Sequence, residues 1–410
     1  MNKIFLVYDG KEYHYKDLLN QLNNLEQVSP YIYEKSQNPF YIFSKILHSI
    51  VFNYSIEILD GDFSENDLQK ININKENLEQ NIKLNYKKMI NTVEELIEMV
   101  KYCSEKWDVA LYTSGTTGLP KKIIHNFESL TRNVKVSEKH NSDVWGFAYN
   151  PTHMAGLQVF FQAFLNLNTI VYLFGKKHLF FKESCNKFCI SHISSTPTFL
   201  NFILSVSDEE TYQTVKRVTF GGEKLPNNIS SKINYYFPNA KVRNIYASTE
   251  FGSILESDGE WFKIPVKFSE VIKIVDNELF INTKLMNNNE EGWFATGDLV
   301  EQFEDGSFKF SSRNTDIINV GGYNVNPLEI EDLLLQLPYI QDAVIYSKPN
   351  SLMGNILAAK IILINTIDTQ QDVLKNIKKY LRDNLQNWKV PRVIEIVEDL
   401  EKNRTGKKVR

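Results

Sequence analysis

The chain has 410 residues, of which 42% are hydrophobic and 23% are charged, and its formal net charge is -4. This length exceeds that of one ordinary domain, and the composition excludes a disordered or collagen-like chain, so we expect two or three globular domains. With so little net charge, no binding to nucleic acid is expected. The three cysteines, Cys103, Cys185 and Cys189, argue against a disulfide scaffold, so we predict a cytoplasmic protein.

Strand-like and helix-like segments alternate from the start of the chain to residue 250. Strands are predicted over 3–8 and 50–59, and helices over 15–25 and 40–52, which favours an α/β fold with largely parallel strands. The uncharged stretch 154–174 could cross a bilayer by its length. Its glutamine and asparagine side chains instead favour a buried helix that leads into a strand, so we expect no membrane insertion.

Two regions depart from this alternation. Residues 63–100 are polar and are interpreted as a surface excursion that ends in a helix. Residues 269–311 consist of short β-rich pieces with turns. Asp305–Gly306 is a hairpin signal within that region. After Arg313, strands and two helices alternate with their own apolar periodicity. The sequence therefore predicts a large α/β domain with a small β-rich subdomain, followed by a small α+β domain.

The strongest local signal is LYTSGTTGLPKK, residues 111–122, which lies between two strand-like segments. Its glycines allow tight turns, its hydroxyls lie beside exposed amides, and its lysines add positive charge, so the loop can wrap polyphosphate oxygens. An ordinary Ser/Thr/Gly-rich surface loop is the alternative. Pro120 stands where the P-loop pattern requires glycine. The candidate phosphate-binding residues are Thr113, Ser114, Gly115, Thr116, Thr117, Gly118 and Lys121.

This loop resembles that of the adenylate-forming superfamily, which comprises acyl- and aryl-CoA ligases, adenylation domains of nonribosomal peptide synthetases and firefly-type luciferases. Its other motifs follow in the family's order, as FGGEKLP (220–226), YASTE (246–250), GWFATGDL (292–299), RNTDIINVGGYNVNPLEIE (313–331) and NRTGK (403–407). The resemblance implies a large ATP- and acyl-binding domain over 1–312, a hinge over 313–316 and a small mobile domain over 317–410. It also places the hinge at Thr315 and Asp316.

The resemblance implies roles for the residues of these motifs. Tyr246 would stack on adenine, Thr249 would bond a phosphate oxygen, and Glu250 would hold Mg²⁺ against the triphosphate. Asp298 has two acceptor oxygens suited to the ribose diol. Lys407 would stabilise the charge that develops when a carboxylate attacks the α-phosphate, with Lys408 as the competing candidate. The other implied ATP-binding residues are Gly222, Glu223, Lys224, Ala247, Ser248 and Arg313.

The same resemblance places the acyl pocket at His153, Gly221 and Gly252, with His153 counted among the catalytic residues. The segment NPTHMAGL, residues 150–157, resembles the Pro-x-x-His-x-x-Gly segment of acyl- and aryl-CoA ligases. Amino-acid-activating relatives usually carry an aspartate where His153 stands, so we predict an acid without a free α-amino group. Ala247 replaces the family's glycine and would narrow the pocket.

We therefore predict an ATP- and Mg²⁺-dependent ligase that converts a small carboxylic acid into an acyl-adenylate and pyrophosphate. It would then transfer the acyl group to a thiol of coenzyme A or of the phosphopantetheine of an acyl carrier protein. Two alternatives stay open, an amino-acid-activating enzyme that loads a carrier protein and a non-catalytic nucleotide-binding paralogue. A zinc site is not predicted, because the spacings of His178, Cys185, Cys189 and His192 do not fit a zinc ribbon.

Overall fold

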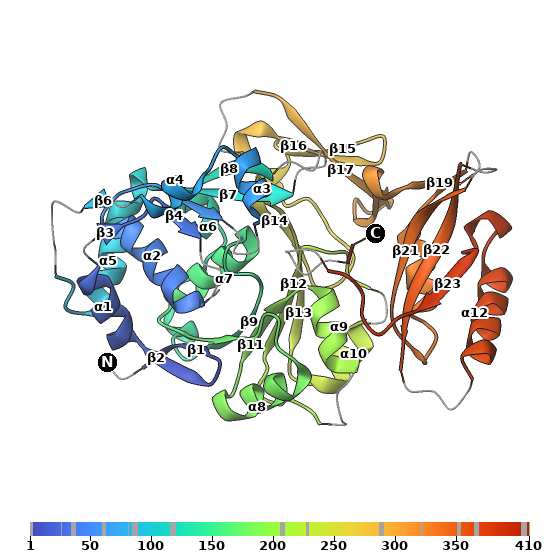
Figure 1. The fold of residues 1–410 in the computed structure, drawn as a ribbon, viewed down its shortest axis with the longest axis horizontal. Coiled ribbons are helices and arrows are strands. Elements are labelled where there is room, and N and C mark those ends of the chain that lie inside the picture. The colour runs from blue at the N-terminus through green and yellow to red at the C-terminus, as the bar shows by residue number, and fades with distance from the viewer. Residues whose placement is uncertain are drawn as a thin grey trace.

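The protein forms a large N-terminal part and a smaller C-terminal part that lie side by side along its longest axis (Figure 1). The predicted fold class, an α/β domain with a β-rich subdomain and a small α+β unit, is confirmed. The computed structural model describes residues 3–25, 27–33, 38–59, 63–80, 82–83, 89–114, 120–205, 210–226, 229–286, 291–320, 323–350, 354–364, 369–402 and 408–409.

An eight-stranded sheet runs through the large part in the order β14-β13-β12-β11-β9-β10-β1-β2. Its six central strands are parallel, as predicted, and only the edge strands β2 and β14 pair antiparallel. The carboxyl ends of the parallel strands therefore meet at one edge, where ligands bind in open α/β sheets. The strands are β1 (Ile4–Tyr8), β2 (Lys11–His14), β9 (Val144–Ala148), β10 (Thr169–Tyr172), β11 (His192–Ser195), β12 (Arg217–Gly221), β13 (Lys241–Ser248) and β14 (Gly252–Ser257).

A second sheet, with the order β4-β5-β7-β8, shares one core with the first sheet and with the helices α1, α2, α5 and α7. Helices α8, α9 and α10 pack on the other face of the eight-stranded sheet. No helix within the described residues is both long and apolar enough to cross a membrane. The bounds are β4 (Tyr31–Tyr33), β5 (Ile56–Leu59), β7 (Asp108–Ser114), β8 (Pro120–Asn126), α1 (Tyr15–Asn24), α2 (Pro39–Val51), α5 (Val93–Cys103), α6 (Phe127–Thr131), α7 (Met154–Phe164), α8 (His178–Phe188), α9 (Pro197–Ser205) and α10 (Ile229–Tyr236).

The strand predicted over 50–59 is wrong in its first half. Helix α2 continues to Val51, and the strand β5 begins only at Ile56. The helix is apolar on nearly every side, and such helices are stable where they are buried all round. The apolar run at 50–52 therefore completes a buried helix instead of starting a strand.

The polar segment 63–100 is more than a surface excursion. It contains α3 (Glu65–Lys70), α4 (Lys75–Glu79) and β6 (Ile82–Lys83), which pairs with β3 (Gln27–Val28). Leu68 and Ile73 are buried in a small core with Tyr112 of β7. This core supports the strand that leads into the predicted phosphate loop.

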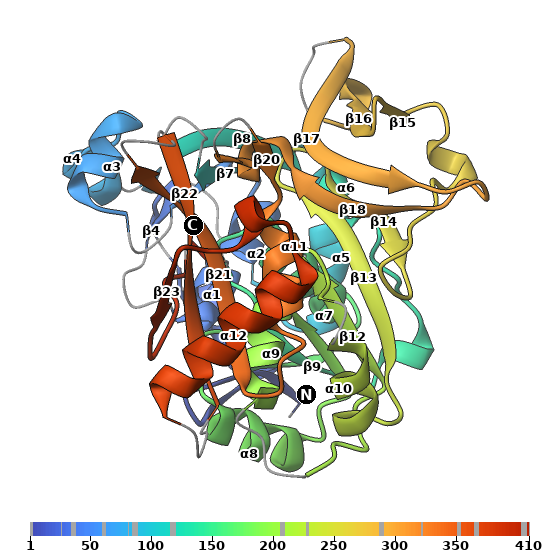
Figure 2. The same cartoon turned by 90° about the vertical axis from the view of Figure 1, so that its right-hand side faces the viewer.

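The predicted β-rich region forms a four-stranded antiparallel sheet that projects from the rest of the large part (Figure 2). The hairpin at Asp305–Gly306 is confirmed, and Gly306 has the positive φ of 76° that such turns favour. Because this sheet ends at Arg313, it brings that residue beside Asp298 on the neighbouring strand. The strands are β15 (Ile272–Val275), β16 (Glu278–Asn282), β17 (Trp293–Gln302) and β18 (Phe308–Arg313).

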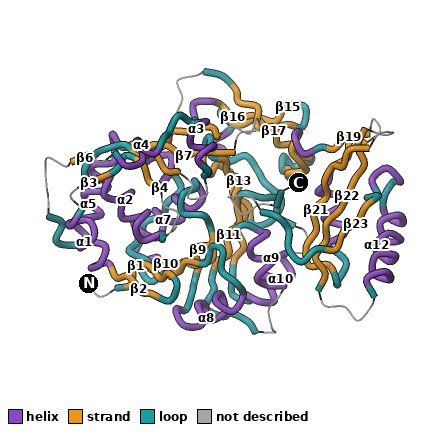
Figure 3. The backbone as a smooth tube through the Cα atoms, viewed as in Figure 1, coloured by secondary structure: helices purple, strands orange, loops and turns teal. Residues whose placement is uncertain are grey.

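The C-terminal part has its own hydrophobic core. Its helix α11 begins where Asn326 caps the backbone N–H of Leu328 and Pro327 occupies the first turn, a strong helix-start pair. Helix α12 covers the face of the sheet that points away from the large part (Figures 1 and 3). The elements are β19 (Ile318–Val320), β20 (Tyr323–Val325), α11 (Pro327–Leu334), β21 (Ile340–Asn350), β22 (Gly354–Leu363), α12 (Gln370–Asn384) and β23 (Val393–Ile396).

Candidate active site

A cleft of about 1870 Å³ lies where the large part, the β-rich subdomain and the C-terminal part meet. Its walls include the carboxyl ends of β12 and β13, helix α7, and residues of β17, β18, α11 and β21. Lys402 and Lys408, near the C-terminus, also line it. These two residues flank the last predicted motif in the sequence, whose residues 403–407 lie outside the described part of the chain; Figure 3 shows the backbone of the two parts on either side of the cleft.

The predicted phosphate loop connects the two strands of the β7–β8 hairpin. Thr113 pairs with Lys121, and Ser114 pairs with Pro120, while Gly115, Thr116, Thr117 and Gly118 lie outside the described residues. The hairpin thus brings both ends of the loop together.

The two lysines that follow this loop have different surroundings. Lys122 donates to Oε1 of Glu57 at 2.6 Å, and that carboxylate also accepts from the Tyr112 hydroxyl at 2.5 Å. Lys121 instead lines the cleft. Of the two, Lys121 is therefore placed to meet a nucleotide.

Tyr246, Asp298 and Arg313 form one hydrogen-bonded group. The buried carboxylate of Asp298 accepts from the Tyr246 hydroxyl and from Nε of Arg313, both at 2.6 Å. Burial raises the pKa of Tyr246, so the phenol stays a neutral donor. Burial opposes the charged form of Arg313, but the attraction of Asp298 outweighs it and raises the pKa of Arg313.

The Tyr246 ring lies flat against Phe310, with centroids 4.4 Å apart, and also lines the cleft. Phe310 belongs to the β-rich subdomain, so this stacking fixes one face of the tyrosine. This stacking supports the Tyr246 ring, which is predicted to serve as a platform for adenine.

Ser248 ends β13 at the carboxyl edge of the sheet, Thr249 and Glu250 follow it, and all three line the cleft. The backbone N–H of Glu250 donates to Oγ of Ser248 at 3.2 Å, which holds the turn. The hydroxyl and carboxylate of Thr249 and Glu250 are hard oxygen donors of the kind that Mg²⁺ prefers.

Sequence reasoning missed His125, which is buried on β8 beside these residues. Its Nδ1 lies 3.3 Å from Oγ of Ser129. Burial lowers its pKa to about 4, against the opposing influence of the Thr249 backbone and the Glu250 carboxylate. A single histidine after the phosphate loop carries no signal on its own, because only the sheet brings it near Glu250.

The glycine turn after β12 contains Gly222, whose φ of 86° favours glycine. Oε2 of Glu223 accepts from the backbone N–H of Thr198 at the start of α9, at 3.1 Å. Lys224 lies 3.4 Å from Asp332 of the C-terminal part. All three line the cleft, and the Lys224 contact ties this turn to the second half of the molecule.

The predicted acyl-pocket residues meet around the start of α7. His153 precedes the helix and lines the cleft, as do Ala247 and Gly221. Gly156 packs so closely on the loop that a Cβ there would lie 2.2 Å from the carbonyl oxygen of Asn150. Gly252, with φ of 73°, leaves room for the Met154 side chain.

Lys408, the competing candidate for the catalytic lysine, is held by contacts within the C-terminal part. Nζ of Lys408 donates to the Ala343 carbonyl and to Asp342, and Glu331 lies 3.8 Å away. Burial alone would lower the pKa of Lys408, but the two carboxylates raise it. Lys407 lies outside the described residues.

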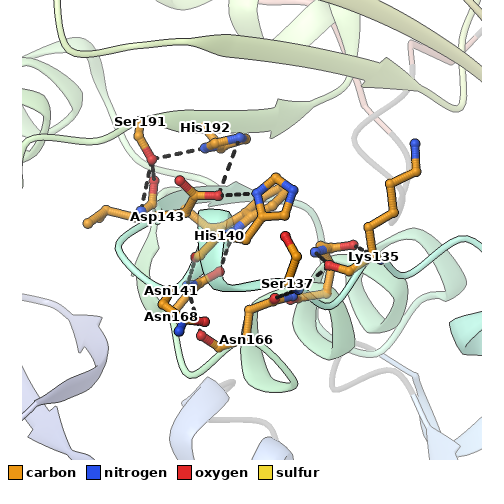
Figure 4. A network of polar contacts seen from close by, with 12 residues as sticks. Lys135, Ser137, His140, Asn141, Asp143, Asn166, Asn168, Ser191 and His192 are labelled. Carbon is orange, nitrogen blue, oxygen red and sulfur yellow. Dashed lines mark hydrogen bonds and ion pairs between the residues drawn. The ribbon is translucent and has the colours of Figure 1, made fainter.

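Of the residues considered for zinc, only His192 takes part in a cluster of metal-ligating side chains. His192 lies with Asp143 and His140, and its Nδ1 is 2.9 Å from Oγ of Ser191 (Figure 4). Cys185 is buried in the core beneath α8, where burial raises the pKa of its thiol. Cys185 lies on α8, whereas Cys189 follows the end of this helix in a left-handed conformation.

Comparison with known proteins agrees with the predicted superfamily. Residues 55–280 match the family model of AMP-binding enzymes, and residues 329–407 match the model of the C-terminal domain of these enzymes. An uncharacterized acyl–CoA ligase of Bacillus subtilis is 26% identical, over 72% of this chain and 63% of its own length. A 2-succinylbenzoate–CoA ligase of Listeria monocytogenes is 26% identical, over 74% of this chain and 70% of its own length. The chain thus spans about two thirds of these relatives.

A solved structure confirms the fold. The o-succinylbenzoate CoA synthetase of Bacillus subtilis, in complex with its acyl-adenylate intermediate, superimposes with a TM-score of 0.68. The two share 18% sequence identity, and the match covers 99% of this chain and 94% of that one.

Proposed function

Because the chain belongs to the family of AMP-binding enzymes, we propose that it activates a small carboxylic acid with ATP. The products of this step are an acyl-adenylate and pyrophosphate. A thiol then takes the acyl group and AMP leaves. Coenzyme A is the acceptor named for the relatives, and the phosphopantetheine of an acyl carrier protein offers the same thiol. We place the reaction in the cytoplasm.

One observation carries this proposal. Residues from five separated motifs, from Lys121 of the phosphate loop to Arg313, line one cleft, and so do His153 and Gly221, two of the residues predicted for the acyl pocket. A nucleotide site alone would not need the apolar start of α7, and an acid pocket alone would not need the ion pair of the buried Asp298 with Arg313. The two together suit a reaction that joins an acid to a nucleotide.

The residues of the cleft suggest how each substrate is held. Asp298 has about four acceptor positions, of which Tyr246 and the two Arg313 contacts take up to three, so at least one is left to accept a ribose hydroxyl. Lys121 can pair with phosphate oxygens. Thr249 and Glu250 would hold Mg²⁺, which supplies charge neutralisation for the triphosphate.

The first step is an attack of the acid's carboxylate on the α-phosphate. A cation beside the attacking and leaving oxygens would stabilise the charge that builds up there. We assign this role to Lys407, since Lys408 is held by Asp342 and Glu331. His153 lies at the acyl end of the cleft, where it would bound the pocket beside the reacting carboxylate.

We further propose that the second step follows a rotation of the C-terminal part about Thr315 and Asp316. These residues belong to a single turn, Asn314–Asp316, between the last strand of the large part and β19. Few residues connect the two cores there, so a change in φ and ψ at this turn reorients the whole C-terminal part.

Exchange of labelled pyrophosphate into ATP tests the proposal directly. We expect exchange that depends on both Mg²⁺ and a carboxylic acid, and acyl transfer when coenzyme A or a phosphopantetheinylated carrier protein is added. A folded protein that exchanges pyrophosphate with no acid in a broad panel would contradict the proposal. If only α-amino acids supported exchange, the enzyme would instead be an amino-acid-activating one.

A further inference from the structure

The part of the cleft beside His153 and Gly221, here called the acyl half, has a wall that lies mostly outside the recognised motifs. β11, β12 and β13 are adjacent parallel strands, and residues two apart on a strand share a face of the sheet. Along β12, Gly221, Thr219 and Arg217 all line the cleft. The wall therefore runs from the carboxyl edge, near the reacting groups, to the amino edge of the sheet, about 13 Å away.

The far end of this wall is basic. His192 of β11 pairs in register with Arg217 of β12, and both line the cleft. Arg217 is half-buried and makes no ion pair within the described part of the chain. Burial, with smaller contributions from Arg217 and Lys216, lowers the pKa of His192 to about 4 against the attraction of Asp143.

The acidic group beside His192 is occupied by other partners (Figure 4). Oδ2 of the buried Asp143 lies 2.8 Å from Nδ1 of His140 and 3.7 Å from Nε2 of His192. The other ring nitrogen of His192, Nδ1, is hydrogen-bonded to Oγ of Ser191. Asp143 therefore orients the histidines of the wall and forms no ion pair with Arg217.

The next strand provides a contrast. Arg243 of β13 also lines the cleft, but its guanidinium lies 2.5 Å from Asp258, and Glu256 and Glu260 line the same side. Its charge is thus compensated by the chain itself. Arg313 binds Asp298, and Arg132 donates to the Phe251 carbonyl at 3.2 Å. Among the described arginines that line the cleft, Arg217 is therefore the one whose guanidinium has neither an ion pair nor a hydrogen bond to the chain.

The opposite wall of the acyl half comes from α7. Ala155 and Val159 give it some apolar surface, but Gln158 and Gln162 line it as well. Gln158 accepts from Oγ of Ser253 at 2.7 Å, which holds the amide in the wall. A plain hydrocarbon tail that reached Arg217 would desolvate amides and a cation without replacing their hydrogen bonds.

We propose that the substrate acid carries a second carboxylate at its far end and that Arg217 binds it. A guanidinium and a carboxylate match each other as a bidentate, charge-assisted pair, which suits a half-buried position. This inference rests on the proposed function, because the first carboxylate must lie at the nucleotide. Arg217 is thus a specificity-determining residue of the acid pocket.

Matched acids test the proposal in the pyrophosphate-exchange assay. Succinate, adipate and suberate are compared with butyrate, hexanoate and octanoate, and the terminal hydroxy acids form a third series. We expect kcat/KM for the best dicarboxylate to exceed that for its monocarboxylate by at least about tenfold, since a site built for a charged partner rejects analogues that lack it. Preference for monocarboxylates or for hydroxy acids would overturn the inference but leave the proposed function intact.

The variant Arg217→Met keeps the length of the side chain and removes its charge. It should lower the dicarboxylate-to-monocarboxylate ratio at least about tenfold while the KM for ATP is unchanged. Lys216→Met is the control, because it removes the same charge from the exposed neighbour outside the cleft lining and should change the ratio less than about twofold. An unchanged ratio in Arg217→Met, or an equal change in both variants, would refute the role of Arg217.

Discussion

The nucleotide end and the acyl end of the cleft differ in whether their charged side chains are already paired within the chain. At the nucleotide end Asp298 already binds Arg313 and Tyr246. At the acyl end Arg217 makes no ion pair within the described residues, and its neighbours are strand and helix side chains. The nucleotide end is thus preorganised around a ligand of fixed chemistry, whereas a substitution at the acyl end can change the acid without disturbing another ion pair.

The largest expected effect concerns the cation at the nucleotide end. Lys407→Ala should lower the rate of adenylation by about a hundredfold to a thousandfold, which is typical for the loss of one group that stabilises a transition state. The affinity for ATP, measured by equilibrium binding, should change only a few-fold. If the rate of adenylation were unchanged in this variant, Lys407 would have no role in the first step.

The variant Lys408→Ala is a useful comparison, because it should lower stability instead of the rate of adenylation. Removing this ammonium leaves the buried Glu331 and Asp342 unpaired, which costs about 3–5 kcal/mol when a buried ion pair loses one member. We expect a lower melting temperature of the C-terminal part. If a folded Lys408→Ala variant lost adenylation, Lys408 would be the catalytic lysine in place of Lys407.

The next effect tests the preorganised pair. Asp298→Asn keeps the shape of the side chain but weakens both the Arg313 contact and the acceptors for the ribose. We expect KM for ATP to rise about tenfold to a hundredfold, since hydrogen bonds to charged groups contribute about 1.5–3 kcal/mol. Tyr246→Phe, which keeps the aromatic ring and removes one hydrogen bond to Asp298, is the control and should have the smaller effect. Equal effects would show that the hydroxyl matters as much as the carboxylate.

Much of the nucleotide end could be predicted from sequence, because each motif there is a short continuous segment with its own turn geometry. YASTE and GWFATGDL identify Tyr246 and Asp298 without knowledge of how they meet. The order of strands and helices was also largely predictable, since apolar periodicity is local. The exception at 50–59 arose because a short apolar run suits both a buried helix and a strand.

The acyl end could not be predicted in the same way. Arg217, His192 and Gln158 come from different elements and meet only because β11, β12 and α7 pack together. His125 reached Glu250 through the same kind of long-range packing. Nothing in the local sequence of a strand distinguishes a side chain that faces a ligand from one that faces solvent.

A smaller effect is expected from the lysines after the phosphate loop. Lys121→Ala removes a charge from the cleft, and we expect a rise of a few-fold in KM for ATP. Lys122→Ala breaks an exposed pair with Glu57, and such pairs contribute at most about 1 kcal/mol. KM for ATP should therefore stay within about twofold in that variant. The same rise in both variants would mean that their charges act at long range, and high salt would then abolish it.

A final test compares the two ends of the cleft through their buried histidines, and it concerns stability instead of catalysis. Burial lowers the pKa of His125 at the nucleotide end, and of His192 at the acyl end, to about 4 from an ordinary value of 6.5. Between these values the unfolded chain binds more protons than the folded one, so stability should fall as the pH decreases from about 6.5 to about 4. Each histidine contributes at most about 1.4 kcal/mol per pH unit. Chemical denaturation across this range should therefore give a shallower pH dependence for His192→Asn than for the wild type, and His125→Asn should do the same. If the slope of either variant matched the wild type, that histidine would be protonated in the folded protein as readily as in the unfolded chain.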